Sequence, residues 1–278
     1  MKGSCLCGNV TWEIEGPLDH MAHCHCSRCR KTHGTAFATY AAAPAAAFRL
    51  NGRESVVRWQ SSPDYARCFC RQCGSVVPSD PFGDSVFIPA GNFDGDPGMR
   101  PLAHVFVASK APWYEIRDSL PQFDAYPPGF DAPVLPDREP LNPRGGARGS
   151  CLCGKVTFVI DGTPIGCWNC HCGRCRKARS AAHATNLFLP ADALCFTSGE
   201  GEVVSYKVPD AIRFAQHFCR TCGAKAPRID RERGIVGIPM GAFDDDPAFK
   251  PQAHIFVASK APWFEISDDL PQHAEYPS

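Results

Sequence analysis

Seven residues near the N-terminus, HCHCSRC at 23–29, hold three cysteines and two histidines and are followed by Arg-Lys. Thiolates and imidazoles are the ligands that zinc prefers in proteins. A structural zinc takes four protein ligands, whereas a catalytic zinc keeps one position open for water or substrate. The segment therefore predicts a zinc site and leaves open which of the two kinds it is.

Cysteine usage across the chain supports metal binding over disulfide formation. The 278 residues include 17 cysteines, an odd number, and many of them lie only two or three residues apart. The N-terminal residues MKGSCLCGNV contain no apolar core of a secretory signal, and no apolar run approaches the length of a membrane span. We therefore expect a cytoplasmic protein whose clustered thiols bind metal.

The charge balance narrows the class of partner. Lys and Arg number 29, and so do Asp and Glu, so the formal net charge is zero. A general binder of nucleic acid or of a membrane surface carries a clear basic excess. The sequence thus predicts small-molecule partners, with no nucleic acid and no membrane among them.

An internal repeat sets the domain organisation. Three motifs occur twice: GSCLCG at 3–8 and 149–154, CHC(S/G)RCRK at 24–31 and 170–177, and FCR(Q/T)CG at 69–74 and 218–223. Two copies of this length indicate a duplicated domain, and the Pro- and Gly-rich stretch between them is typical of a linker. We expect domains at 1–125 and 149–278, joined by a linker at 126–148 and packed as a pseudo-dimer.

Each copy has the pattern of a mainly β domain. Alternating apolar and polar residues predict strands at 10–16, 54–61, 85–91 and 104–109, and at 156–162, 202–208 and 234–241 in the second copy. No segment has an extended helical period. We expect small, twisted antiparallel sheets held together by metal, with a short helical turn after Cys29 and after Cys175.

Seven cysteines recur in each copy, and seven is the sum of a four-ligand and a three-ligand site. The CLCG and CRQCG motifs end in Gly, which permits the positive φ of a tight thiolate-binding turn. Two such turns bring four sulfurs to one metal. The predicted structural zinc sites are Cys5, Cys7, Cys70 and Cys73, and Cys151, Cys153, Cys219 and Cys222.

The remaining cysteines form a triad in each copy: Cys24, Cys26 and Cys29, and Cys170, Cys172 and Cys175. One short segment can supply three corners of a zinc and leave the fourth free. His25 and His171, or Cys68 and His217, are the side chains able to close the site instead. We favour the open site, in which the triad cysteines are the reactive centre.

The order C-x-C-G, C-H-C-x-x-C-R-K, F-C-x-x-C-G and H-x-F-V-A-S-K-A-P-W resembles the glutathione-dependent formaldehyde-activating (GFA) / CENP-V family over nearly the whole of both copies. The resemblance implies two zinc-bound β-tent domains, each with a four-cysteine structural zinc and a labile zinc on the triad. It also implies condensation of formaldehyde with glutathione to S-hydroxymethylglutathione, the activity of a carbon–sulfur lyase.

Three thiolates suit that chemistry. Their charge weakens zinc as a carbonyl polariser but favours a fourth sulfur, held as a nucleophilic thiolate. Addition of this sulfur to a small aldehyde gives an S-hydroxyalkyl adduct. Basic residues beside the triads, Arg30, Lys31, Arg176 and Lys177, are candidates for binding glutathione carboxylates, with a solvated basic turn as the alternative.

His104 and His254 are possible acid–base groups, and the SKAPW segments after them are expected to form packed turns. Gly34 and Phe37 become Ser180 and His183, so the second site is altered if Gly34 admits substrate. A non-catalytic zinc scaffold and a thiol-based zinc or redox sensor are the alternatives to an enzyme.

Overall fold

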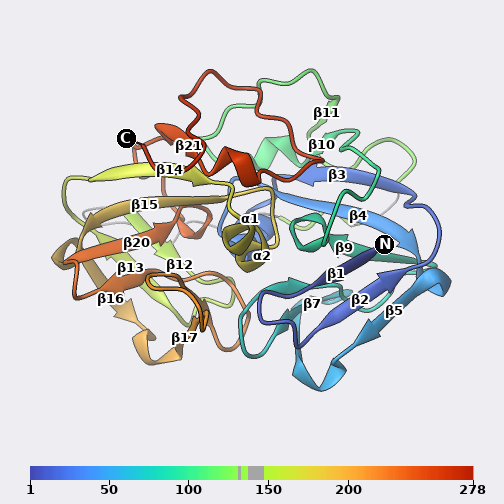
Figure 1. The fold of residues 1–278 in the computed structure, drawn as a ribbon, viewed down its shortest axis with the longest axis horizontal. Helices are drawn as coiled ribbons and strands as arrows, with labels where there is room; N and C mark the ends of the chain where they lie inside the picture. The colour runs from blue at the N-terminus through green and yellow to red at the C-terminus, as the bar shows by residue number, and fades with distance from the viewer. Residues whose placement is uncertain (131–132, 137–146, 278) are drawn as a thin grey trace.

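The two copies form two halves that lie side by side, with helices α1 and α2 together at the centre (Figure 1). The computed structural model describes residues 1–130, 133–136 and 147–277, so residues 131–132 and 137–146 of the expected linker and Ser278 lie outside the described residues. None of the helices in the described ranges has the length and apolar character needed to cross a bilayer.

The first half contains three sheets and one α-helix. The elements are β1 (Lys2–Ser4), β2 (Thr11–Ile14), β3 (His20–Cys24), α1 (Ser27–His33), β4 (Ala38–Pro44), β5 (Phe48–Asn51), β6 (Val56–Ser62), β7 (Tyr65–Cys70), β8 (Val76–Val77), β9 (Ser85–Pro89), β10 (His104–Val105) and β11 (Gln122–Phe123). Their strand orders are β1-β2-β5, β11-β10-β3-β4-β9 and β6-β7-β8. Most pairs are antiparallel, whereas β10 runs parallel to β3 and β11.

The second half repeats this plan. Its elements are β12 (Ala147–Ser150), β13 (Thr157–Ile160), β14 (Gly166–Cys170), α2 (Gly173–Arg179), β15 (Ala184–Pro190), β16 (Leu194–Ser198), β17 (Val203–Lys207), β18 (Ala215–Cys219), β19 (Arg228–Asp230), β20 (Ile235–Pro239) and β21 (Ala253–Ile255). Strands β19-β20-β15-β14-β21 form the large sheet, and β21 runs parallel to β14. The predicted mainly β class with small antiparallel sheets is therefore confirmed.

Details of the elements differ from the sequence-based expectation. The predicted strand at 104–109 is wrong beyond Val105, because Phe106 takes a left-handed conformation and a 3₁₀ turn follows at Val107–Ser109. Helix α1 begins at Ser27, before Cys29, since the Cys26 sulfur caps it. Strand β4 was not predicted, because its Ala-rich sequence has no alternation for a pattern to detect.

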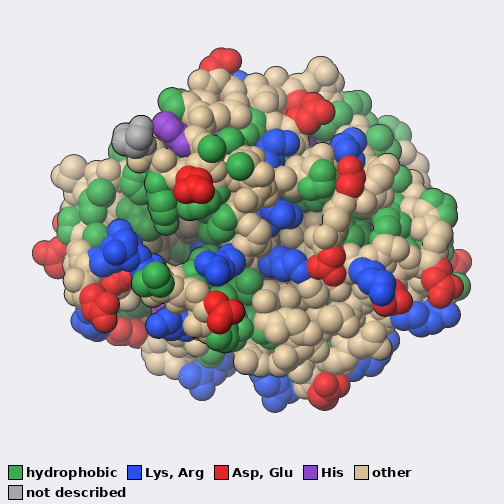
Figure 2. Space-filling model, viewed as in Figure 1, with side chains coloured by type: hydrophobic (Ala, Val, Ile, Leu, Met, Phe, Trp, Pro, Cys, Tyr) green, Lys and Arg blue, Asp and Glu red, His purple; other side chains and the backbone are tan. Residues whose placement is uncertain are grey.

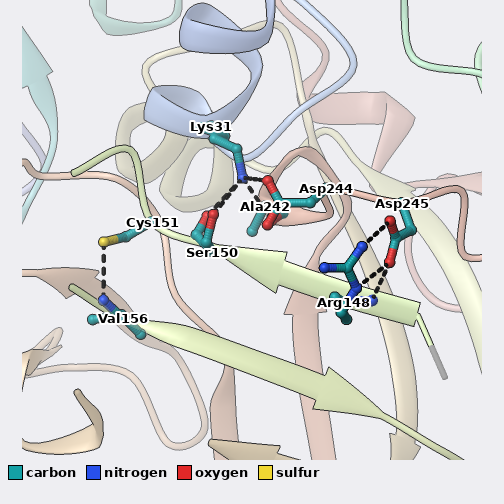
Figure 3. A network of polar contacts seen from close by, with 8 residues as sticks. All are labelled: Lys31, Arg148, Ser150, Cys151, Val156, Ala242, Asp244 and Asp245. Atoms are coloured by element: carbon teal, nitrogen blue, oxygen red, sulfur yellow. Dashed lines mark hydrogen bonds and ion pairs between the residues drawn. The ribbon is translucent and has the colours of Figure 1, made fainter. Parts of the chain in front are cut away.

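A buried ion pair joins α1 to the second half. The Nζ of Lys31 lies 2.7 Å from Asp244 Oδ1, and both side chains are less than a tenth exposed. The same ammonium donates to the Ser150 carbonyl and hydroxyl, at 2.9 and 3.1 Å, and to the Ala242 carbonyl at 3.2 Å (Figure 3). These four acceptors all belong to the second half.

The contact is reciprocal. Lys177 of α2 pairs with Asp94 and donates to the hydroxyl of Ser4, both in the first half. Glycines allow each helix to approach the opposite half closely: a Cβ on Gly241 would lie 2.3 Å from the Arg30 carbonyl, and one on Gly91 would lie 2.1 Å from the Ala181 nitrogen. One buried apolar cluster runs through both halves, so they share a core.

The two ion pairs differ in burial, and this difference predicts a difference in stability. Asp244→Asn leaves the Lys31 charge buried without its counterion, which costs about 3–5 kcal/mol. Asp94→Asn removes a pair whose side chains are 26% and 46% exposed, and such pairs contribute about 0–1 kcal/mol. Urea unfolding of the two variants measures the free energies. Equal losses would contradict a dominant role for the Lys31–Asp244 pair.

Candidate metal centres and active site

Four cysteines of the first half meet as predicted. The sulfurs of Cys5, Cys7, Cys70 and Cys73 all lie within 4.8 Å of one another. Cys5 and Cys7 sulfurs are 3.5 Å apart, and those of Cys7 and Cys70 are 3.6 Å apart. A tetrahedral zinc with Zn–S bonds of about 2.3 Å has edges of about 3.8 Å, so these distances fit zinc.

The second four-cysteine group, Cys151, Cys153, Cys219 and Cys222, has the same arrangement. Its measured sulfur separations are 3.4 Å between Cys151 and Cys153 and 3.8 Å between Cys153 and Cys219. Backbone N–H groups point at the first sulfur of each group, from Val10 at 3.3 Å and from Val156 at 3.2 Å. The turn glycines that follow these motifs have positive φ, as expected: Gly8, Gly74, Gly154 and Gly223.

The triads form separate groups of three sulfurs. Cys24, Cys26 and Cys29 lie within 4.8 Å of one another, as do Cys170, Cys172 and Cys175, and no histidine belongs to these groups among the described residues. The Cys24 sulfur comes from the end of β3, and Cys26 caps α1 by accepting from the Cys29 N–H at 3.4 Å. The end of β3 and the start of α1 thus bring the three sulfurs of the first triad together.

Strand alternation directs the neighbouring histidines away from the triad. His23 bonds Thr39 Oγ1 at 2.8 Å, and His25 Nε2 bonds His104 Nδ1 at 2.8 Å. The second nitrogen of His104 lies 3.0 Å from the carboxylate of Asp118. A carboxylate accepts, so His104 donates to it through Nε2–H and accepts from His25 Nε2–H. Burial and His104 lower the pKa of His25 to about 3, which keeps it neutral.

The same histidine chain occurs in the second half. His171 Nε2 lies 2.7 Å from His254 Nδ1, and His254 Nε2 lies 3.0 Å from Asp268. The predicted packed turns after these histidines are present too: Lys110 Nζ donates to the Tyr114 carbonyl at 2.5 Å, and Trp113 is buried. His104 and His254 therefore hold His25 and His171, the residues between the first two cysteines of each triad, in a fixed orientation.

An apolar pocket of about 310 Å³ opens over the first triad, and Cys24, Cys26 and Cys29 lie in its lining. Arg67 from β7 is the buried cation of this pocket, with Nη2 3.6 Å from the Cys29 sulfur. Hydrogen bonds from Cys24 and Cys26 lower the pKa of Cys29 well below its ordinary range, and the charge of Arg67 lowers it further against burial. The Arg67 charge thus favours an anionic sulfur in the first triad.

Tyr40 lines the same pocket in a defined orientation. His33 Nδ1 lies 2.7 Å from the Arg179 carbonyl, so Nδ1 carries the proton. Burial and Lys225 lower the pKa of His33 to about 3, which leaves Nε2 as an acceptor. The Tyr40 hydroxyl, 2.9 Å away, therefore donates to His33 and turns its oxygen lone pairs elsewhere.

The second triad has different surroundings. Gln216 and Asn186 stand where Arg67 and Tyr40 stand in the first half. Arg179, at the position of His33, donates to Asn186 Oδ1 at 2.7 Å and is buried. Burial lowers its pKa to about 10, and Cys175 acts in the opposite direction. Each triad thus has one buried arginine near it, supplied by a different element.

The four predicted glutathione-binding cations lie in different places. Lys31 and Lys177 are directed at the opposite half, so the structure gives them protein partners in place of a substrate carboxylate. Arg176 remains near the second triad, where burial lowers its pKa and Cys172 opposes the shift. Arg30 is half-buried on α1, and its charge reaches His25.

Gly34 has a structural reason that differs from the predicted one. It caps α1 at φ 68°, and a Cβ there would lie 2.8 Å from Lys225 Cβ and 2.9 Å from Arg179 Nη1. Its close neighbours thus belong to the second half. Ser180, the counterpart, has φ 55° and donates from Oγ to the Val76 carbonyl at 3.0 Å.

Sequence reasoning missed Arg67 and Tyr40, which lie outside the cysteine motifs. The signal that could have found them is the difference between the copies, since the aligned positions hold Gln216 and Asn186. Charged or aromatic residues retained in one copy alone indicate a role peculiar to that copy. The surface gives no such signal, because basic and acidic side chains are interspersed on the face shown in Figure 2.

The two kinds of thiol group predict two outcomes for loss of one sulfur. Cys70→Ser should release the metal of the four-cysteine group and unfold the first half, because structural zinc contributes about 10–16 kcal/mol to small domains. Cys26→Ser should lower the zinc content with the fold retained. Elemental analysis and thermal unfolding measure both effects. Unfolding by both variants would indicate that the triad metal is purely structural.

A match to a known protein family agrees with this geometry. The family model described as glutathione-dependent formaldehyde-activating enzyme matches residues 1–109 and 146–259. No curated protein sequence matches the chain. A crystal structure of a Rhodobacter sphaeroides protein is similar at 27% identity, covering 34% of this chain and 89% of that one, with a TM-score of 0.30. The chain belongs to the GFA family and contains its domain twice in tandem.

Proposed function

We propose that the chain adds a glutathione-like thiol to a small aldehyde such as formaldehyde, reversibly, as a zinc-dependent carbon–sulfur lyase. The observation that carries the proposal is that Cys24, Cys26 and Cys29 form a group of three sulfurs in the lining of a pocket, whereas the structural sites have four sulfurs each. Three ligands leave one position for a substrate sulfur. Membership of a family of glutathione-dependent formaldehyde-activating enzymes supports this choice.

Each half would hold one structural zinc on its four cysteines and one labile zinc on its triad. Zinc on the triad would keep a fourth, substrate sulfur deprotonated and nucleophilic near neutral pH. The metal charge of two and three thiolates leave a net negative charge at this site. Arg67, 8% exposed and next to Cys29, offsets that charge with a guanidinium that stays protonated.

The residues around the triad match the charge changes of the reaction. As sulfur adds to the carbonyl carbon, the carbonyl oxygen becomes negative, and the Arg67 guanidinium is the buried cation available to stabilise it. The Nε of Arg67 is buried and has no hydrogen-bond partner among the described groups, so this guanidinium is incompletely paired within the protein. Tyr40, whose proton points at His33, offers an acceptor to the hydroxyl of the adduct.

The first test compares the two triads. Cys26→Ser should abolish most of the enzyme-dependent formation of S-hydroxymethylglutathione, because the first triad has the pocket and Arg67 beside it. Cys172→Ser is the matched variant, and we expect it to retain the larger share of activity. Exchange NMR of glutathione with formaldehyde measures the rate. Full activity in Cys26→Ser would contradict a reactive first triad.

The second test replaces Arg67 by the residue of the other copy. Arg67→Gln should lower kcat/KM about a hundredfold, the usual effect of removing one donor to a developing oxyanion. The zinc content should not change, since Arg67 is not a ligand. Arg67→Lys restores the charge without the planar fork and should recover part of the rate. Unchanged activity in Arg67→Gln would remove Arg67 from the mechanism.

A further inference from the structure

The pocket over the first triad is larger and more apolar than formaldehyde requires. Its volume is about 310 Å³, and its walls include the aromatic residues Phe82, Phe87, Phe106, Tyr126 and Phe130. Pockets of about 300 Å³ and above with apolar walls and few polar groups suit organic ligands of many atoms. Formaldehyde has two heavy atoms, so its own contacts would cover little of these walls, and a larger group of one of the two substrates is needed to fill them.

The apolar space adjoins the sulfurs directly. His20, Ala22, Cys24 and Cys26 all line the pocket, which is the two-residue period of an extended strand. Ala22 is therefore the next side chain to Cys24 on the pocket face of β3. Its small size leaves room beside the sulfur at which a substrate would react.

Residues after the first domain supply one wall. The ring of Tyr126 lies 4.7 Å from that of Phe106 and 4.7 Å from that of Phe130. Further along, Arg28 of α1 donates to the Pro136 carbonyl at 3.0 Å. These contacts hold the described part of the linker against the pocket. They also engage one N–H of Arg28, which lines the same pocket.

The second half has a larger side chain at the position equivalent to Ala22. The position of Ala22 is taken by Trp168, which pairs with Asn186 as Ala22 pairs with Tyr40. The pair Ala42 and Phe87 becomes Phe188 and Gly237. The Trp168 and Phe188 rings lie 5.1 Å apart, and a Cβ on Gly166 would lie 2.6 Å from the indole. Trp168 thus places an indole where the first half has the methyl group of Ala22, whereas Phe188 and Gly237 only reverse the sizes of Ala42 and Phe87 across the strand pair.

We propose that the first site acts on aldehydes whose carbonyl carries an aromatic or branched hydrocarbon group, and that this group occupies the pocket. The inference rests on the proposed thiol addition. The thiol sulfur bonds to the carbonyl carbon, the π pair of the C=O bond moves to oxygen, and the oxygen takes the proton that the thiol loses. The product is an S-(1-hydroxyalkyl) adduct, and neither an oxidant nor a reductant takes part.

The experiment uses the full chain with Cys172→Ser, so that the first triad alone reports. Exchange NMR measures adduct formation from glutathione with formaldehyde, 3-methylbutanal and phenylacetaldehyde. We expect kcat/KM for the two larger aldehydes to exceed that for formaldehyde about tenfold or more, as burial of a hydrocarbon group allows. A chain with Cys26→Ser, which reports on the second triad, should show no such preference.

Two substitutions test the pocket itself. Ala22→Trp introduces the side chain of the second half and should abolish the preference for larger aldehydes. Phe130→Ala removes part of the linker wall at a position 37% exposed, where folding is not at risk, and should reduce the preference several-fold. Zinc content and thermal unfolding confirm that each variant is folded.

The outcomes separate the two proposals. Adduct formation with formaldehyde but no gain with the larger aldehydes would overturn this inference and leave the proposed function standing. A gain that appears when phenylmethanethiol replaces glutathione, with formaldehyde as the partner, would assign the pocket to the thiol and also overturn it. No enzyme-dependent adduct with any pair would overturn the proposed function.

Discussion

The buried ion pair between Lys31 and Asp244 connects the reactive centre to the architecture. Lys31 lies on the short helix α1, whose first turn carries Cys29 and whose cap is Cys26. Fixing the lysine against the second half therefore also fixes two sulfurs of the first triad. Because Lys177 and Asp94 repeat the contact in the opposite direction, each triad is positioned by residues of the other half.

The alternation of side chains along β3 places the metal-binding residues and the residues that hold them on opposite faces of the strand. Strand β3 directs Ala22 and Cys24 into the pocket and His23 into the core. One segment therefore supplies both a sulfur ligand and a buried side chain that packs behind it. The hydrogen bonds from His25 to His104 and from His104 to Asp118 restrict the motion of these buried side chains. Ligands held by neighbouring hydrogen-bonded groups keep their geometry when substrate exchanges at the open position.

Much of this could be predicted from the sequence, because metal ligation and strand pairing leave short-range patterns. The spacing of Cys5, Cys7, Cys70 and Cys73, with glycines after the second and fourth, indicates a four-sulfur site without further information. The role of Lys31 could not be predicted in this way, because an Arg-Lys pair next to a cysteine triad is equally compatible with binding a substrate carboxylate and with a contact between the two halves. Arg67 and the linker aromatics reach the triad only through tertiary folding, which local patterns do not record.

Gly34 shows what the covalent joining of two copies permits. In a symmetric dimer each substitution appears on both sides of the interface, so a large residue packed on Gly34 of one subunit would also pack on Gly34 of the other. Here Arg179 presses on Gly34, whereas Ser180, the twin of Gly34, bonds the Val76 carbonyl instead. The two reactive centres can therefore diverge in sequence one at a time, with each half still serving as the other's scaffold.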